Sequence, residues 1–406
     1  MTSAPGVRRV VVGVGVVLAL ALVAAVVVFA LLRFSPLWGA IGMFEDGRRA
    51  ETFRTMDTIF PAQRIAPGDD PWLFTVDLRQ LPAAYTFAGE ERSIAAFLEA
   101  TETTGLLVAR DGVIVHESYH RGYDARARIA SFSVAKSFVT ALVGIAIERG
   151  HIASIDDALE LYVPELADGG YAGVTVRHAL TMTSGIAFDE AYDDASSDVM
   201  GLPIQVYGLR RSVPVILSRL ARARPPGLER DYVSSDALVL GVVVSRAVGM
   251  PLAAFLEQAI WVPAGMESDA AWNTDLHDHA LAHGFLNATL RDFARFGRLV
   301  LHGGARDGRQ IVPAAWIDDA LRARDTPRTV TGAQPFGADF GLGYHWWLPR
   351  PRDGDAVAIG IYGQYLYVHP GLGVVIVKTS TDAGFTGREA ETVEALRAIA
   401  RSLAAD

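Results

Sequence analysis

One segment limits what the rest of the chain can fold into, because it predicts a helix that must be buried. Residues 138–150 read Phe-Val-Thr-Ala-Leu-Val-Gly-Ile-Ala-Ile-Glu-Arg-Gly. An apolar run of this length that ends at a glycine is typical of a helix, and this one is too apolar to lie on a surface. The rest of the chain must therefore supply elements that pack around it.

Ser133 and Lys136, just before this run, form an S-x-x-K pair. If the helix begins near Ser133, residues three apart share a face, and the amine of Lys136 lies beside the hydroxyl of Ser133. A serine needs a base to become nucleophilic, and a lysine can serve when burial lowers its pKa. The helix N-terminus also offers free N–H groups to an oxyanion. Alone, the pair is a weak signal, because any helix can carry Ser and Lys three apart.

The composition excludes several classes of function. The chain has 406 residues, a formal net charge of −9 and no cysteine. Without a basic run to neutralise phosphates, the sequence argues against a nucleic-acid partner. The absence of cysteine excludes disulfides, thiolate metal sites and a cysteine nucleophile.

Residues 10–32 form an unbroken apolar run that is bounded by Arg8, Arg9 and Arg33. The run is long enough to cross a bilayer, and no convincing small-residue cleavage site follows it. We predict a short tail at residues 1–9 and a single-pass transmembrane anchor at residues 10–32. Positive charges on its two sides are nearly balanced, and we expect the folded domain on the extracytoplasmic side.

Residues 33–90 contain scattered prolines and aromatic residues. This composition indicates an extended arm with few regular elements, in which Trp38 and Phe44 are candidates for the membrane interface. A helix over about residues 92–102 is expected to follow the arm.

Two β-rich runs, 105–110 and 113–119, flank Asp111-Gly112, which is a strong hairpin signal. The second run contains His116 and leads to His120, in an H-E-x-x-H pattern that binds zinc only on a helix. On a strand the two histidines would be about 13 Å apart, at roughly 3.3 Å per residue. We therefore predict a strand without zinc.

Helices and turns are expected over about residues 150–340, and strands return from 341 to 378 before a final helix near 388–403. The order predicts an α+β domain at residues 91–404, with an antiparallel sheet built from both ends and a mostly helical insert. The acidic loop 189–194, taken alone, is typical of a solvated loop. His277, His279 and His283 cluster in another loop, but their scattered placement makes a metal site a weak hypothesis.

Three motifs in order resemble those of the serine β-lactamase and penicillin-binding-protein superfamily. Ser133-Val134-Ala135-Lys136 matches the nucleophile motif, Tyr232-Val233-Ser234 matches the Tyr-x-Asn motif, and Ala358-Ile359-Gly360 falls at the strand that lines the site. With residues 190–194 and 360–364, the chain looks most like the 6-aminohexanoate-dimer (nylon-oligomer) hydrolase branch. The resemblance covers about residues 65–404.

This resemblance implies a β-lactamase/transpeptidase-like fold and a role for each matching residue. Ser133 would attack a carbonyl and form an acyl-enzyme, Lys136 would relay the proton, and Tyr232 would protonate the leaving group. The backbone N–H groups of Ser133 and Ile361 would form the oxyanion hole. Substrate-binding positions would be Tyr192, Ser234 and Gly360.

At two positions this sequence departs from the β-lactamase motifs, which limits how far the substrate specificity of β-lactamases can be expected here. Ala358 offers no cation where β-lactamases keep a lysine, and Ser234 replaces an asparagine that orients their substrates. The predicted function is a membrane-anchored serine hydrolase, without metal or cofactor, that cleaves a small amide or ester. The alternatives are a catalytically idle, membrane-tethered binding or sensor protein on the same fold, and a D-peptidase or β-lactamase.

Overall fold

The computed structural model describes residues 5–33, 36–40, 42–324 and 340–403. Its largest sheet has eight strands, and the order confirms that both ends of the chain build it: β12 (Phe340–Leu342), β13 (Trp347–Pro349), β14 (Ala356–Gly360), β15 (Gln364–His369), β16 (Val374–Ser380), β5 (Thr103–Arg110), β6 (Val113–Tyr119) and β2 (Thr75–Val76). The predicted hairpin is present, because β5 and β6 pair across Asp111-Gly112. The predicted sheet is antiparallel throughout. The structure differs at one edge, where β2 pairs with β6 in parallel.

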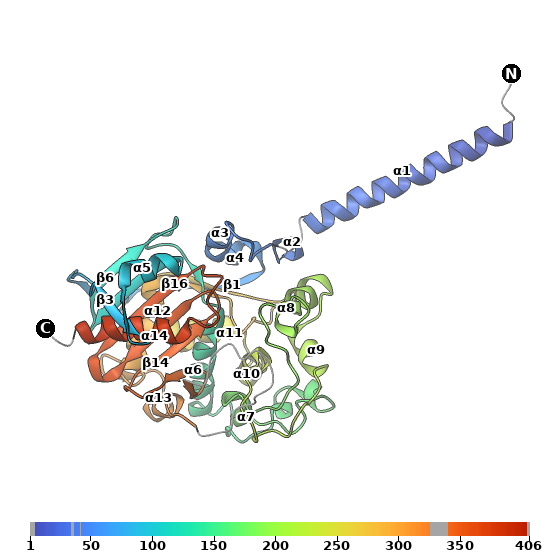
Figure 1. Cartoon of the computed structure of the whole chain (residues 1–406). Helices are drawn as coiled ribbons and strands as arrows, with labels where there is room; N and C mark the ends of the chain where they lie inside the picture. Colours follow the sequence, from blue (N-terminus) through green and yellow to red (C-terminus); the bar gives the residue numbers. More distant parts are fainter. Residues whose placement is uncertain (1–4, 34–35, 41, 325–339, 404–406) are drawn as a thin grey trace.

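Alternating side chains of the strands pack against helices on the two faces of this sheet. Leu106 and Val108 belong to the cluster that includes residues of α5 (Ile94–Ala100) and α14 (Glu389–Ser402). Leu107 and Ala109, whose side chains point to the other face, belong to a second cluster. This cluster contains residues of α12 (Leu290–Leu301) and α6 (Ala135–Glu148), as expected for a strand buried on both faces. Figure 1 shows α14 and α12 on opposite sides of the sheet.

The helical insert lies beside α6, which is buried over most of its length, as its composition predicts. Besides α12, its helices include α7 (Val176–Leu180), α8 (Asp198–Pro203), the π-helix η4 (Ile204–Gly208), α9 (Val213–Ser218), α10 (Ser234–Val248), α11 (Leu252–Leu256), the π-helix η5 (Glu257–Trp261) and α13 (Ala314–Ala320). The insert also carries strands: β8 (Ala270–Asn273) and β9 (Leu286–Ala288) join β1 (Ala62–Ile65) and β7 (Ile129–Ala130) in a four-stranded sheet. The part of the insert at residues 325–339 falls outside the described residues.

The segment 33–90 is more regular than the sequence predicts. It forms α2 (Pro36–Ala40), α3 (Arg49–Arg54), α4 (Met56–Ile59), the edge strands β1 and β2, and a hairpin of β3 (Ala84–Phe87) and β4 (Glu90–Ser93). The helix predicted over 92–102 begins at Ile94, because Ser93 ends β4 and its side chain caps the helix by accepting from the N–H of Ala96. Short elements that pair with distant strands leave no periodic signal in the local sequence.

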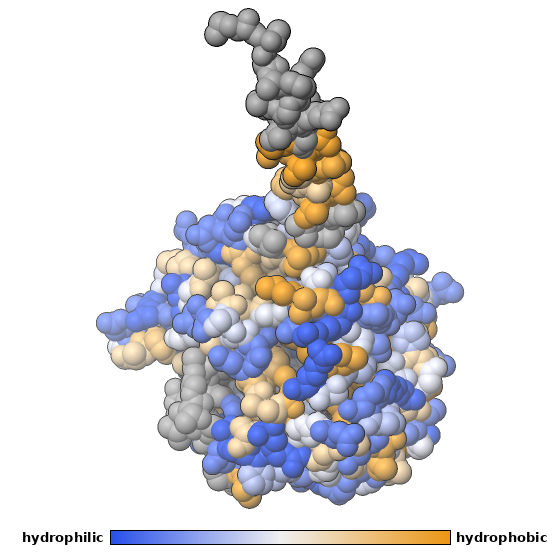
Figure 2. All heavy atoms as spheres, turned by 90° about the vertical axis from the view of Figure 1, so that its right-hand side faces the viewer, coloured by the Kyte–Doolittle hydropathy of each residue, from blue (hydrophilic) through white to orange (hydrophobic). Residues whose placement is uncertain are grey.

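The N-terminal helix α1 (Pro5–Arg33) projects away from the folded domain (Figure 1). Figure 2 shows its apolar surface above the mixed polar surface of the domain. In the described residues, no single helix meets the length and apolarity required to cross a membrane; the apolar stretch of α1 is Val14–Ala30. α10 and residues 252–261 meet that requirement only as a pair, which is bent by 76°.

Candidate active site

Ser133 lies where the chain leaves β7 and turns into the central helix. A short 3-10 turn, Phe132–Val134, leads directly into α6. Phe132 has a φ of 42°, in the left-handed region that a bulky residue rarely adopts. Its ring packs edge-on against Phe53, with 4.8 Å between ring centroids. The surrounding core thus holds a strained backbone immediately before Ser133, as is common at functional sites.

Lys136 is completely buried, and its amine has three fixed partners. Nζ lies 2.7 Å from Ser133 Oγ, 2.8 Å from the carbonyl oxygen of His283 and 3.2 Å from Ser234 Oγ. Desolvation lowers the pKa of Lys136 to about 8, against a smaller opposing effect of the Glu190 carboxylate. A substantial fraction of this amine is therefore neutral near pH 8, in contact with the serine hydroxyl.

Tyr232 reaches the same serine from the loop just before α10, two residues ahead of its first residue, Ser234. Its phenol is a hydrogen-bond partner of the Ser133 side chain, and Lys136 Nζ lies 5.0 Å from the centroid of the tyrosine ring. Burial, with a further contribution from Glu190, raises the pKa of Tyr232 above its ordinary value. The phenol therefore stays protonated at neutral pH. The structure thus brings together Ser133, Lys136 and Tyr232, as the sequence predicts.

Glu190, which was not among the predicted site residues, lies buried beside this group. Its carboxylate accepts hydrogen bonds from the N–H of Ser234 at 2.8 Å, from the Ser234 hydroxyl and from the Tyr192 hydroxyl at 2.6 Å. It therefore caps the N-terminus of α10, where the helix dipole favours a negative charge. Burial raises the pKa of Glu190, whereas Lys136 and the hydrogen bonds lower it. The interpretation of loop 189–194 as solvated is wrong for this residue.

Gly360 brings a strand edge against the backbone of the nucleophile. A Cβ built on Gly360 would lie 2.6 Å from the carbonyl oxygen of Ser131 and 3.1 Å from the nitrogen of Ser133. Only glycine permits this approach of β14, and it places Ile361 beside Ser133. Ile361 itself lines the neighbouring pocket. Gly360, predicted to bind substrate, thus sets the distance between the two backbone segments.

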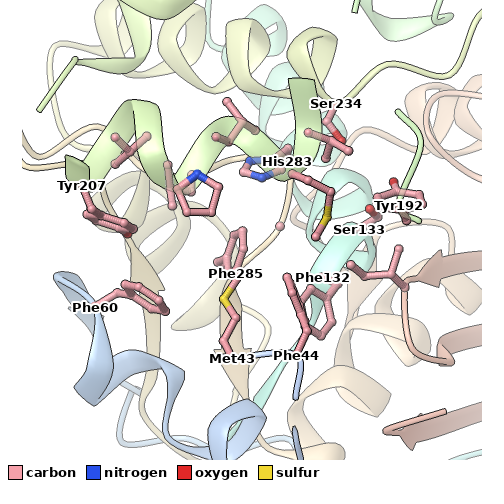
Figure 3. Close-up of a pocket in the computed structure, with 18 residues that line it drawn as sticks. Met43, Phe44, Phe60, Phe132, Ser133, Tyr192, Tyr207, Ser234, His283 and Phe285 are labelled. Carbon is pink, nitrogen blue, oxygen red and sulfur yellow. The ribbon is translucent and has the colours of Figure 1, made fainter. Parts of the chain in front are cut away.

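A pocket opens beside Ser133 (Figure 3), and Tyr192, Ser234 and Ile361 are among its lining residues. The Ser234 hydroxyl is engaged by Lys136 and Glu190. The ring of His283 also lines the pocket, and its buried Nδ1 has no hydrogen-bond partner among the described residues. Burial lowers the pKa of His283 well below its ordinary value, so this imidazole is neutral.

Three other histidines singled out in the sequence form hydrogen bonds outside the site. His277 Nε2 lies 3.0 Å from the carbonyl of Arg210, and His279 Nδ1 lies 2.9 Å from Asp275. His116 lies on β6, so the strand prediction is confirmed, and its Nε2 lies 3.1 Å from Ser118 Oγ. Within the described ranges, no cluster of three or more His, Asp or Glu could hold a metal ion.

A serine at the start of a buried helix, beside a desolvated amine and a phenol, defines a class of protein: the serine hydrolases of the S-x-x-K type. The chain belongs to the beta-lactamase family, whose sequence profile matches residues 91–401. This match confirms the resemblance to that superfamily.

Two curated relatives are similar over most of the chain. The 6-aminohexanoate-dimer hydrolase of Paenarthrobacter ureafaciens is 32% identical over 294 residues, which cover 70% of this chain and 74% of the relative. Esterase EstB of Burkholderia gladioli is 27% identical, with coverage of 81% and 97%. A solved structure from Bacillus anthracis, assigned as a 6-aminohexanoate-dimer hydrolase, superposes with a TM-score of 0.79 at 23% identity and covers 89% of this chain and 96% of its own. The last comparison supports the β-lactamase/transpeptidase-like fold.

Proposed function

We propose that this chain is a membrane-anchored serine hydrolase that cleaves a small amide or ester through an acyl-enzyme on Ser133. The observation that carries the proposal is the convergence of Lys136 Nζ, at 2.7 Å, and the Tyr232 phenol on the Ser133 hydroxyl. The names of two relatives, a hydrolase of an amide dimer and an esterase, support this range of substrates.

The reaction uses the protonation states that the site favours. Neutral Lys136 takes the proton from Ser133 Oγ as the oxygen bonds to the substrate carbonyl carbon. The amides of Ser133 and Ile361 stabilise the oxyanion, and the helix dipole of α6 adds to this effect. Tyr232 donates its proton to the leaving amine or alkoxide, and Lys136 returns a proton to the phenol. Water then attacks the acyl-enzyme and gives its proton to the neutral Lys136–Tyr232 pair. The bond from the acyl carbon to Ser133 Oγ breaks, and Lys136, at 2.7 Å, passes that proton to the serine oxygen.

A fluorophosphonate should label Ser133 in the full-length protein, and a Ser133→Ala variant should remain unlabelled. Mass spectrometry of the labelled peptide identifies the site. With 4-nitrophenyl esters, the same protein should turn over many times, whereas acylation without turnover would favour an idle binding protein. No adduct on Ser133 under conditions in which the protein is folded would refute the proposed chemistry.

We also propose that α1 inserts in the bilayer and that the domain lies on the extracytoplasmic side. Exposed apolar side chains from Val14 to Phe29 support this proposal, because such a surface is unfavourable in water. The same labelling experiment, carried out on intact cells, tests this proposal about the membrane. A membrane-impermeant fluorophosphonate should label Ser133, and protein recovered outside the membrane fraction, or labelled by permeant reagent alone, would contradict it.

We expect kcat/KM to rise with pH through about 8, because the Lys136 amine must be neutral to accept the serine proton. Below that value the neutral fraction falls about tenfold per pH unit, so activity at pH 6 should be about a hundredth of its plateau. A pH profile of kcat/KM with an uncharged ester measures this rise, which forms the acidic limb of the profile.

Glu190→Gln provides the control for assigning the limb to Lys136. The Glu190 carboxylate raises the pKa of Lys136, so its removal should move the limb to lower pH. Tyr192→Phe removes a hydrogen bond to Glu190 but leaves its charge, and the limb should stay near its original position. If the pH at which kcat/KM rises is the same in Glu190→Gln as in the unmodified protein, the titrating group is not Lys136.

A further inference from the structure

Apolar side chains make up most of the lining of the pocket beside Ser133. The described residues that line it include no Asp, Glu, Lys or Arg. Two tyrosines contribute rings and not free hydroxyls, because Tyr192 donates to Glu190 and Tyr207 donates to the carbonyl of Thr274 at 2.9 Å. The polar groups that remain are those of Ser133, Ser234 and the neutral His283. Among the described lining residues, a ligand group in this pocket would therefore meet no charged partner.

The arm that follows α1 closes one side of the pocket. Phe44 stacks on Tyr362, with 5.2 Å between ring centroids, and Phe60 stacks on Tyr207 at 4.9 Å. Both phenylalanines line the pocket. Phe44, which the sequence assigned to a membrane interface, is therefore part of the site. Figure 3 shows Ser133 at one side of the pocket and the Phe60–Tyr207 pair at the other, so the space is elongated away from the nucleophile.

The position of Tyr232 indicates which part of a substrate enters this space. Tyr232 is the proton donor for the leaving group, and it is absent from the residues that line the pocket. It packs instead against Trp347, with 5.4 Å between ring centroids. The leaving group thus lies on the Tyr232 side of Ser133, and the pocket receives the acyl group.

We propose that the pocket selects an uncharged aliphatic acyl group, so that the substrates are esters or amides of simple fatty acids. The inference rests on the proposed function and specifies its substrate class. An ammonium or carboxylate at the end of the acyl chain would lose its hydration against mostly apolar walls, and the described lining offers no opposite charge to pair with it, which is strongly unfavourable. A methyl end would gain by burial.

A pair of isosteric substrates tests this directly on the full-length protein. Heptanoyl and 6-aminohexanoyl 4-nitrophenyl esters differ only in a terminal methyl or ammonium group, and their spontaneous hydrolysis is subtracted with Ser133→Ala. We expect kcat/KM for the heptanoyl ester to be at least tenfold higher. An equal or inverted ratio in the unmodified protein would overturn the inference. Labelling of Ser133 by fluorophosphonate reports on the proposed function separately, so the two failures are distinguishable.

A charge placed in the pocket should reverse the preference. Met200, which lines the pocket from α8, is half-buried, so Met200→Glu introduces a carboxylate near the acyl chain. Ile204, four residues later, is 55% exposed and does not line the pocket, so Ile204→Glu is the matched control. The heptanoyl to 6-aminohexanoyl ratio should fall at least tenfold in the first variant and stay unchanged in the second. Equal effects of the two substitutions would contradict the assignment of the pocket.

Discussion

Replacing Lys136 by methionine should lower kcat/KM about 10³-fold and leave the protein folded. General acid–base groups contribute about 10²–10⁴-fold, and Lys136 is the base that contacts the Ser133 hydroxyl. Methionine has a similar volume and is well tolerated in a buried position. The His283 carbonyl loses this donor, and a buried polar group left without a partner costs about 1–3 kcal/mol. Ser234 Oγ keeps its hydrogen bond to Glu190. Steady-state kinetics and thermal unfolding measure the two effects.

The chain offers a matched control in its other completely buried lysine. Lys378 lies on β16, and its Nζ lies 5.7 Å from the ring centroid of Phe97, on the face of the sheet that α5 covers. Burial lowers its pKa to about 7, yet Ser133 is not among its partners. Lys378→Met should therefore change stability without changing kcat/KM more than a few-fold. If both methionine variants keep most of their activity, the base is a different group, with Tyr232 as the first candidate.

The parts of the site that follow from local sequence could be predicted. Ser133 and Lys136 are three residues apart on a helix start, so their contact needs no knowledge of the fold. The hairpin at Asp111-Gly112 is equally local, since two successive residues must adopt positive φ. Tyr232 is distant in sequence, and it was placed by the order of motifs and not by spacing.

The parts of the site that depend on tertiary placement could not be predicted. Glu190 lies in an acidic loop whose composition is typical of solvent, and its burial arises only because it caps α10. The partner that His283 offers to Lys136 is a backbone carbonyl, which every residue possesses. Phe44 and Phe60 reach the pocket through short elements of a Pro-rich arm, and no periodicity marks their inward faces. A buried acidic residue beside a motif helix is a signal that could be sought in other chains.

Replacing Gly360 by alanine should lower kcat about 10²-fold, close to the effect of deleting one oxyanion-hole donor, which is about 10²–10³-fold. The new Cβ would lie 2.6 Å from the carbonyl oxygen of Ser131, a backbone atom that cannot rotate away. The end of β14 must then move away from the turn that carries Ser133, and the amide of Ile361 moves with it. Overpacking of this kind also costs about 1–3 kcal/mol of stability, so lower activity alone would not identify the cause.

Gly297→Ala separates the effect on the oxyanion hole from the effect on the fold. Gly297 lies on α12, where an added Cβ would meet the side chain of Val375 at 2.6 Å, at a contact between helix and sheet outside the residues that line the pocket. Both alanine variants should therefore unfold at lower temperature, but only Gly360→Ala should lose kcat at a temperature where both are fully folded. If the two variants retain equal kcat under those conditions, the approach of β14 serves packing alone, and the Ile361 amide is not needed to stabilise the oxyanion.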